Sequence, residues 1–196
     1  MLSTFDLAHK FTAKWEGAFF DHPNDPGGAT NYGVSLRWLK DEGIDIDGDG
    51  KIDIADIRAL TPAKAAELFK KHFWDKLQLD ALPKLTAIVT YDAAVNTGRG
   101  QAVKFLQRAC NLIGGEQLSV DGALGPKTRR SAELIALLAD RSLAELCIQE
   151  RAAFHNMLCD NSPYPDGRDF RPFRRGWLNR TSDLHGYFGA LAKECV

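Results

Sequence analysis

The sequence predicts a mainly helical protein with two lobes, and three observations favour this fold class. Apolar residues recur at helical spacing along most of the chain. Strand patterns are scarce, and the best of them, near residues 30–35, predicts only part of a small hairpin. The pattern changes at glycines near residues 98–100, where one helix-rich half gives way to another. We therefore expect two domains, residues 1–98 and residues 99–196.

In the first half, two helices flank an irregular segment. The first helix is expected over residues 5–15, because its apolar residues are three or four positions apart and a serine and a threonine precede it as possible caps. Residues 21–32 contain repeated prolines and glycines, which indicate irregular backbone. A second helix is expected over residues 62–74, since Pro62 suits the first helical position and apolar residues follow along one side.

The remaining helices are expected on either side of a glycine-rich loop at residues 114–126. Two amphipathic segments precede this loop and two helical patterns follow it. They cover residues 85–95, 101–110, 128–138 and 143–158. The tail from residue 161 is rich in proline, arginine and aromatic residues, and it closes with apolar residues at helical spacing.

Size and composition exclude several classes of protein. The chain has 196 residues, of which 44% are hydrophobic, and its net charge is only −1, so it can bury a core and is not predominantly disordered. Charged residues break every apolar stretch well short of the ~20 residues that a membrane span needs. No long basic run indicates a nucleic-acid partner. Residues 1–10 lack the pattern of a secretory signal, so we expect synthesis in the cytosol.

The acidic segment 45–56 has the spacing of a twelve-residue calcium loop, with a glycine at position 6 where a sharp turn is required. The predicted ligands are Asp45, Asp47, Asp49, Lys51 (through its carbonyl), Asp53 and Asp56. Carboxylates this close repel each other unless a cation compensates them, which favours one structural Ca²⁺ ion over a solvated acidic turn. Position 12 holds an aspartate instead of the bidentate glutamate of an EF-hand, so we expect moderate affinity.

Glu16 is the candidate catalytic acid. It lies at the predicted end of the first helix, next to Trp15, and desolvation beside an aromatic side chain raises the pKa of a carboxyl group. A glycosidase needs such a protonated acid, and a second group must support the oxocarbenium-like transition state or activate water. Asp25 and Thr30 follow in the irregular segment. Spacing alone is weak evidence, because a glutamate at a helix end is usually a surface residue.

The segment 15–35 resembles the signature of glycoside hydrolase family 108, whose members read roughly E-G-G-Y, N-D-P and D-P-G-G-x-T-x-x-G-I-T. Three later segments resemble further motifs of the family in the same order: the D-x-x-V-N-x-G helix at 91–98, the predicted peptidoglycan-binding region around 120–128, and the closing motif at 176–180. The chain departs from the signature at residues 18, 19 and 35, and none of these changes falls on Glu16, Asp25 or Thr30.

The resemblance implies a lysozyme-like, two-lobed helical fold with a small β or irregular active-site loop and an EF-hand-like calcium loop. Residues 1–98, including the calcium loop, would form the catalytic lobe, and residues 99–196 a helical peptidoglycan-binding lobe. Glu16 would be the proton donor, supported by Asp25 and Thr30.

Two further residues are candidates for substrate binding. Tyr32 either stacks on a sugar or packs within the protein. Asn96 either forms a hydrogen bond with an N-acetyl group or caps its helix before a glycine. The residues leave both alternatives open.

The family consists of N-acetylmuramidases found widely in phages and prophages. We therefore expect an endolysin that cleaves the β-1,4 bond between N-acetylmuramic acid and N-acetylglucosamine, with inverting or retaining stereochemistry left open. It would be a monomer that acts on peptidoglycan strands after release from the bacterial cytoplasm through a holin-made pore, without inserting into a membrane. The alternatives are a non-catalytic peptidoglycan-binding or secretion-associated protein with this fold, and a calcium-dependent interaction module.

Overall fold

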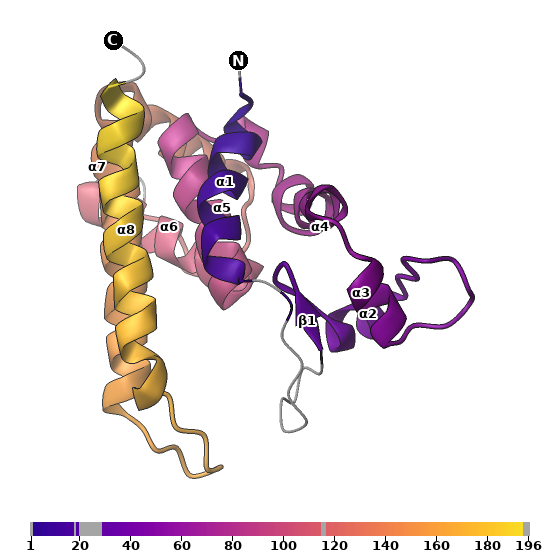
Figure 1. Ribbon diagram of the computed structural model, residues 1–196. Coiled ribbons are helices and arrows are strands. Elements are labelled where there is room, and N and C mark those ends of the chain that lie inside the picture. Colours follow the sequence, from indigo (N-terminus) through magenta and orange to yellow (C-terminus); the bar gives the residue numbers. More distant parts are fainter. Residues whose placement is uncertain (1, 18, 20–28, 115–116, 194–196) are drawn as a thin grey trace. The chain divides into compact units, whose positions relative to one another are not determined.

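The computed structural model describes residues 2–17, 19, 29–114 and 117–193. It is mainly helical with one two-stranded sheet, which confirms the predicted fold class (Figure 1). The helices are α1 (Thr4–Glu16), α2 (Leu36–Glu42), α3 (Ile54–Ala59), α4 (Pro62–Phe69), α5 (Lys84–Thr97), α6 (Arg99–Ile113), α7 (Pro126–Asp160) and α8 (Arg174–Lys193). The strands are β1 (Thr30–Asn31) and β2 (Val34–Ser35), and the short segments are the π-helix η1 (Lys70–Asp75) and the 3₁₀ turns η2 (Leu79–Ala81) and η3 (Arg171–Phe173).

The chain forms two compact units. The larger unit combines Met1–Phe11 with Phe73–Val196, and the smaller unit is Thr12–His72. These units divide the chain elsewhere than the predicted domains 1–98 and 99–196, which stay a prediction. Among the described residues, no helix has the length and hydropathy that a membrane span requires.

The core of the larger unit is built around α5, which packs against α6 and α7. Its residues from Thr86 to Ala94 are all buried, so this helix is not the amphipathic segment that the sequence pattern predicted. Proline precedes α5 and offers no side-chain cap. Asp140 of α7 caps the helix instead, because its carboxylate accepts hydrogen bonds from the backbone N–H groups of Leu85 and Thr86 at 3.1 and 3.2 Å.

The long helix α7 joins the two helical patterns predicted at 128–138 and 143–158. Ala139 has non-helical angles (φ −154°, ψ 40°), so the backbone breaks where the apolar pattern was interrupted. The last helix, α8, lies along α7 (Figure 1). The larger unit is therefore a helical bundle in which α7 contacts α5, α6 and α8.

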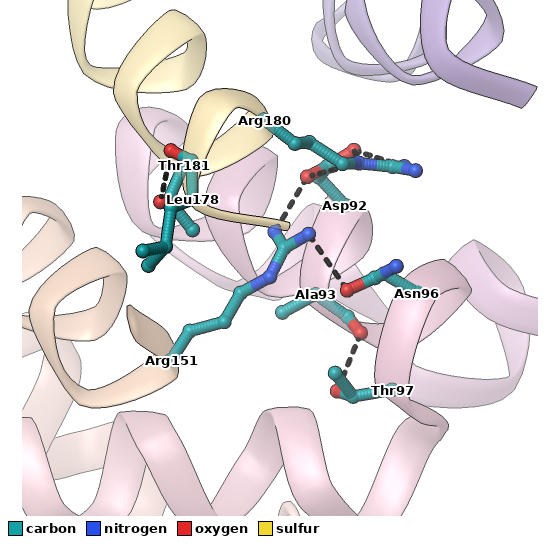
Figure 2. A network of polar contacts seen from close by, with 8 residues as sticks. All are labelled: Asp92, Ala93, Asn96, Thr97, Arg151, Leu178, Arg180 and Thr181. Carbon is teal, nitrogen blue, oxygen red and sulfur yellow. Dashed lines mark hydrogen bonds and ion pairs between the residues drawn. The ribbon is translucent and has the colours of Figure 1, made fainter. Parts of the chain in front are cut away.

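A buried ion network joins three of these helices (Figure 2). Asp92 of α5 is fully buried and accepts hydrogen bonds from Arg151 of α7 at 2.6 Å and from Arg180 of α8 at 2.7 Å. Both arginines are themselves buried. Burial alone would raise the pKa of Asp92, but the two positive charges outweigh it and hold this pKa below its ordinary value. The Asp92 carboxylate is thus ionised inside the protein because Arg151 and Arg180 supply its counter-charges.

Replacing Asp92 by asparagine should destabilise the protein strongly, because two buried arginines would lose their counter-charge. Breaking a buried charge pair in this way costs about 3–5 kcal/mol. We expect a loss of that size in the free energy of unfolding measured by urea denaturation. The control Asp166→Asn removes an exposed partner of Arg168 and should cost less than about 1 kcal/mol. Equal losses in both variants would contradict the role assigned to Asp92.

Candidate active site

A tight hairpin lies at the centre of the candidate site. Strands β1 and β2 pair antiparallel, with Thr30 opposite Ser35, and the two residues between the strands form the turn. Tyr32 and Gly33 have positive φ values of 48° and 79°. A two-residue turn with positive φ at both positions is the type I′ turn, whose twist suits a hairpin. The small hairpin expected near residues 30–35 is thereby confirmed.

The Glu16 side chain lies against this turn. Glu16 is the last residue of α1 and is half-buried. A Cβ atom added to Gly33 would lie 2.6 Å from Cβ of Glu16 and 3.0 Å from its carboxylate Oε2. Since real Cβ atoms do not approach other atoms this closely, only glycine fits at this position. The absence of a side chain at Gly33 therefore allows the hairpin to hold the carboxyl group of Glu16 at its turn.

The hairpin also carries two of the other predicted site residues. Thr30 is half-buried on β1, and Tyr32 is exposed at the turn. The structure thus brings Glu16 together with the hairpin that bears both side chains. Asp25, the predicted second carboxylate, lies outside the described residues. Asn96 belongs to the larger unit and is described below.

The acidic loop connects α2 to α3 in the smaller unit. Ser35 caps α2, and Asp53 caps α3 by accepting from the backbone N–H of Ala55 at 2.7 Å. Between the two helices, carboxylate oxygens of Asp45, Asp47 and Asp49 lie within 4.8 Å of one another. Gly50, at position 6, has a φ of 85°, as the sharp turn of a calcium loop requires. Three of the predicted ligands therefore converge.

Asp53 and Asp56 are engaged differently from these three. Asp53 acts as the helix cap, and Asp56 is buried and accepts hydrogen bonds from the backbone N–H groups of Ile46 at 2.6 Å and Asp53 at 2.7 Å. Burial raises the pKa of Asp56, but these backbone hydrogen bonds outweigh burial and lower it. The side chains of the last two predicted aspartates thus stabilise the loop backbone. The predicted carbonyl ligand, Lys51, donates its backbone N–H to Asp49 at 2.8 Å.

The three convergent carboxylates fit a hard cation electrostatically. A hydrogen bond from the Asp49 backbone N–H lowers the pKa of Asp47, yet desolvation and the charges of Asp49, Asp56 and Asp45 together raise it above its ordinary value. The loop therefore holds negative charges that repel one another. A divalent cation with oxygen ligands would relieve this repulsion.

The loop is connected to the hairpin through α3. The buried side chain of Asn31 on β1 donates to the backbone carbonyl of Ile57 in α3 at 3.0 Å. Because α3 follows the acidic loop directly, a change in the loop can displace the strand that leads into the turn at Gly33. The acidic loop, the hairpin and Glu16 all belong to the smaller unit.

In the larger unit, Asn96 lies in the last turn of α5. Its side-chain oxygen accepts a hydrogen bond from Arg151 at 3.0 Å, so the oxygen does not cap the helix as one alternative proposed. The backbone N–H of Gly98 bonds to Ala94 at the helix end instead. The other alternative, contact with an N-acetyl group, stays a prediction.

Sequence reasoning missed two features of these sites. Gly33 was not singled out, although a glycine inside the predicted hairpin near residues 30–35 is a signal for a positive-φ turn. Arg151 was also missed, because an arginine in an amphipathic helix pattern usually faces solvent. Its sequence neighbourhood gives no signal of burial.

Comparisons with known proteins match the chain to two family models and to a solved structure. The family model Glycosyl hydrolase 108 matches residues 9–98, and the model Predicted Peptidoglycan domain matches residues 101–182. Among solved structures, SagA of Brucella abortus is similar, with 32% identity and a TM-score of 0.70 over 96% of this chain and 94% of that chain. No curated protein matches the chain. The chain therefore belongs to glycosyl hydrolase family 108, and it is a glycoside hydrolase that carries a predicted peptidoglycan domain.

Proposed function

We propose that this peptidoglycan hydrolase is an N-acetylmuramidase, which cleaves the β-1,4 bond between N-acetylmuramic acid and N-acetylglucosamine with Glu16 as general acid. The observation that supports this role best is the position of Glu16 at the end of α1, packed against the turn at Gly33. An acid catalyst must be held at a defined place relative to the oxygen that it protonates. A surface glutamate at a frayed helix end would lack such a constraint.

In this mechanism Glu16 donates its proton to the glycosidic oxygen as the bond breaks. A second group then supports the positive charge on the sugar or activates water. Thr30 is one candidate, because its hydroxyl lies on the strand that leads into the turn at Gly33. Asp25 is the other candidate, from the sequence alone. Tyr32, exposed at the turn, would offer its ring to a sugar.

We also propose that Asp45, Asp47 and Asp49 bind one structural Ca²⁺ ion. The ion would neutralise the repulsion between these carboxylates and fix α3, which holds the hairpin through Asn31. It would take no part in the chemistry. As a phage or prophage endolysin, the protein would reach the cell wall after release from the bacterial cytoplasm, a role that the family suggests.

Replacing Glu16 by glutamine should abolish most of the activity, because glutamine keeps the shape of the side chain but cannot donate the proton. General acid catalysis contributes about 10²–10⁴-fold to the rate. We expect a loss in this range in the release of reducing ends from purified peptidoglycan. The control Glu67→Gln changes an exposed glutamate of α4 in the same unit and should keep wild-type activity. A Glu16 variant with the wild-type rate would leave the non-catalytic alternative standing.

Replacing Gly33 by alanine should lower kcat by displacing Glu16, because the new methyl group would overlap its side chain. The control is Gly43→Ala at the end of α2. Gly43 has a similar φ of 67°, but a Cβ there meets nothing within 4 Å. Both variants therefore carry the strain of a positive φ, about 1–2 kcal/mol, and only the first moves the acid. Equal kcat values for the two variants would show that the contact with Gly33 does not position Glu16.

Calcium should raise the thermal stability of the wild-type protein. An ion present at 100 times its dissociation constant adds about 2.7 kcal/mol to the free energy of unfolding. Asp47→Asn keeps the acceptor for the Asp49 N–H but removes a charge, so it should stabilise the calcium-free loop slightly and reduce the gain from calcium. The control Asp41→Asn, outside the loop on α2, should keep the full gain. Thermal melting with and without calcium measures both effects, and an absent shift in the wild type would contradict the proposed site.

A further inference from the structure

We propose that a pocket in the larger unit binds the peptide stem of peptidoglycan, with the Asn96 amide as its principal hydrogen-bond donor. The proposal rests on the proposed function, because it takes peptidoglycan as the substrate. The pocket has a volume of ≈ 310 Å³ and is lined by the end of α5, the second half of α7, the segment that follows α7, and Trp177 of α8. All of these residues belong to one compact unit.

The buried ion network fixes which way the Asn96 amide faces. Arg151 has only N–H donors, so the atom of Asn96 that lies 3.0 Å from it must be the side-chain oxygen. Arg151 is itself held by Asp92 at 2.6 Å. Figure 2 shows the Asn96 nitrogen on the side of the amide away from Arg151. Asn96 lines the pocket, and its NH₂ group is therefore available there as a donor to a carbonyl or carboxylate oxygen.

The aromatic rings of the pocket favour small apolar groups over a stacked sugar. His155 stacks on the Trp177 ring with a centroid distance of 4.5 Å, and Phe173, which does not line the pocket, stacks on the same ring at 5.6 Å. The guanidinium of Arg168 lies over the rings of Tyr164 and Phe170 at 5.6 and 5.8 Å. Protein groups thus already occupy ring faces on which a sugar would stack. To a ligand these rings present an apolar wall, which can contact a methyl group.

Two further polar groups line this wall. Arg168 is exposed and uses its Nε to bond Asp166 at 2.7 Å, which leaves its terminal N–H groups to a ligand carboxylate. His155 is buried, and its Nδ1 has no hydrogen-bond partner within the described part of the chain. Burial, together with the charges of Arg151 and Arg180, lowers the pKa of His155 to about 4, so the ring is neutral at neutral pH.

These groups match the chemistry of the stem. Stem peptides consist of short residues with alanine methyl groups, amide N–H and carbonyl groups, and free carboxylates. The Asn96 amide and Arg168 would bind the oxygens, and the aromatic wall would contact a methyl group. A neutral sugar would leave the terminal N–H groups of Arg168 without an anionic acceptor, since Asp166 accepts from the Nε–H. The pocket would therefore select strands whose stems carry an accessible carboxylate.

The test is a calorimetric titration of the full chain with the free tetrapeptide L-alanyl-γ-D-glutamyl-meso-diaminopimelyl-D-alanine. The decisive variant is Asn96→Asp. It keeps an oxygen for Arg151 and adds one negative charge beside a network that holds two arginines and one aspartate, so the fold should persist. It also replaces the donor by a carboxylate that repels the ligand. We expect the affinity for the tetrapeptide to fall about tenfold or more.

The control Asn179→Asp makes the same change at an exposed position of α8 that does not line the pocket, and it should keep the wild-type affinity. Melting temperatures of both variants near that of the wild type would show that the fold is intact. The proposal is overturned if the wild type does not bind the tetrapeptide, or if Asn96→Asp binds it as well as Asn179→Asp does. Glu16→Gln should bind the tetrapeptide normally, so a failure of the catalytic assignment would appear only in the reducing-end assay.

Discussion

The close approach between Gly33 and Glu16 is the constraint on which the candidate active site depends. A Cβ at Gly33 would lie 2.6 Å from the Cβ of Glu16, so the turn residue has to be glycine. This turn also requires a positive φ at two successive residues, as the type I′ turn of a tight hairpin does. The sheet is far too small to contribute much stability. Its role is to bring a backbone without a side chain against a carboxyl group.

The carboxylates of the two units have opposite electrostatic surroundings. Asp92 is buried with two arginines, so its charge is stabilised by the protein itself. The carboxylates of Asp45, Asp47 and Asp49 converge near the surface, and the pKa of Asp47 rises because its neighbours repel it. The first cluster is complete with protein groups alone. The second would lose its repulsion on binding a cation, as proposed above for calcium.

The sequence predicts what depends on local pattern and misses what depends on packing. The hairpin and the break at Ala139 follow from turn chemistry and from interruptions of the apolar period. The burial of α5 from Thr86 to Ala94 does not, because Thr90 and Asp92 look like a polar face until Arg151 and Arg180 are placed beside them. In the same way, spacing identified Glu16 as a candidate, but its contact with Gly33 depends on the tertiary structure, which sequence periodicity does not predict.

The ion network of the larger unit has consequences beyond stability. A buried pair that only held helices together could be replaced by apolar residues at little cost. Here the same arginine that neutralises Asp92 also fixes the Asn96 amide, and the two arginine charges add to burial in lowering the pKa of the nearby His155. An apolar substitute would leave the amide free to rotate, and it would remove the part of the lowered His155 pKa that comes from the arginines while the part from burial stayed. Retaining charge in the core therefore makes sense if the hydrogen-bonding character of the adjoining pocket has to be fixed.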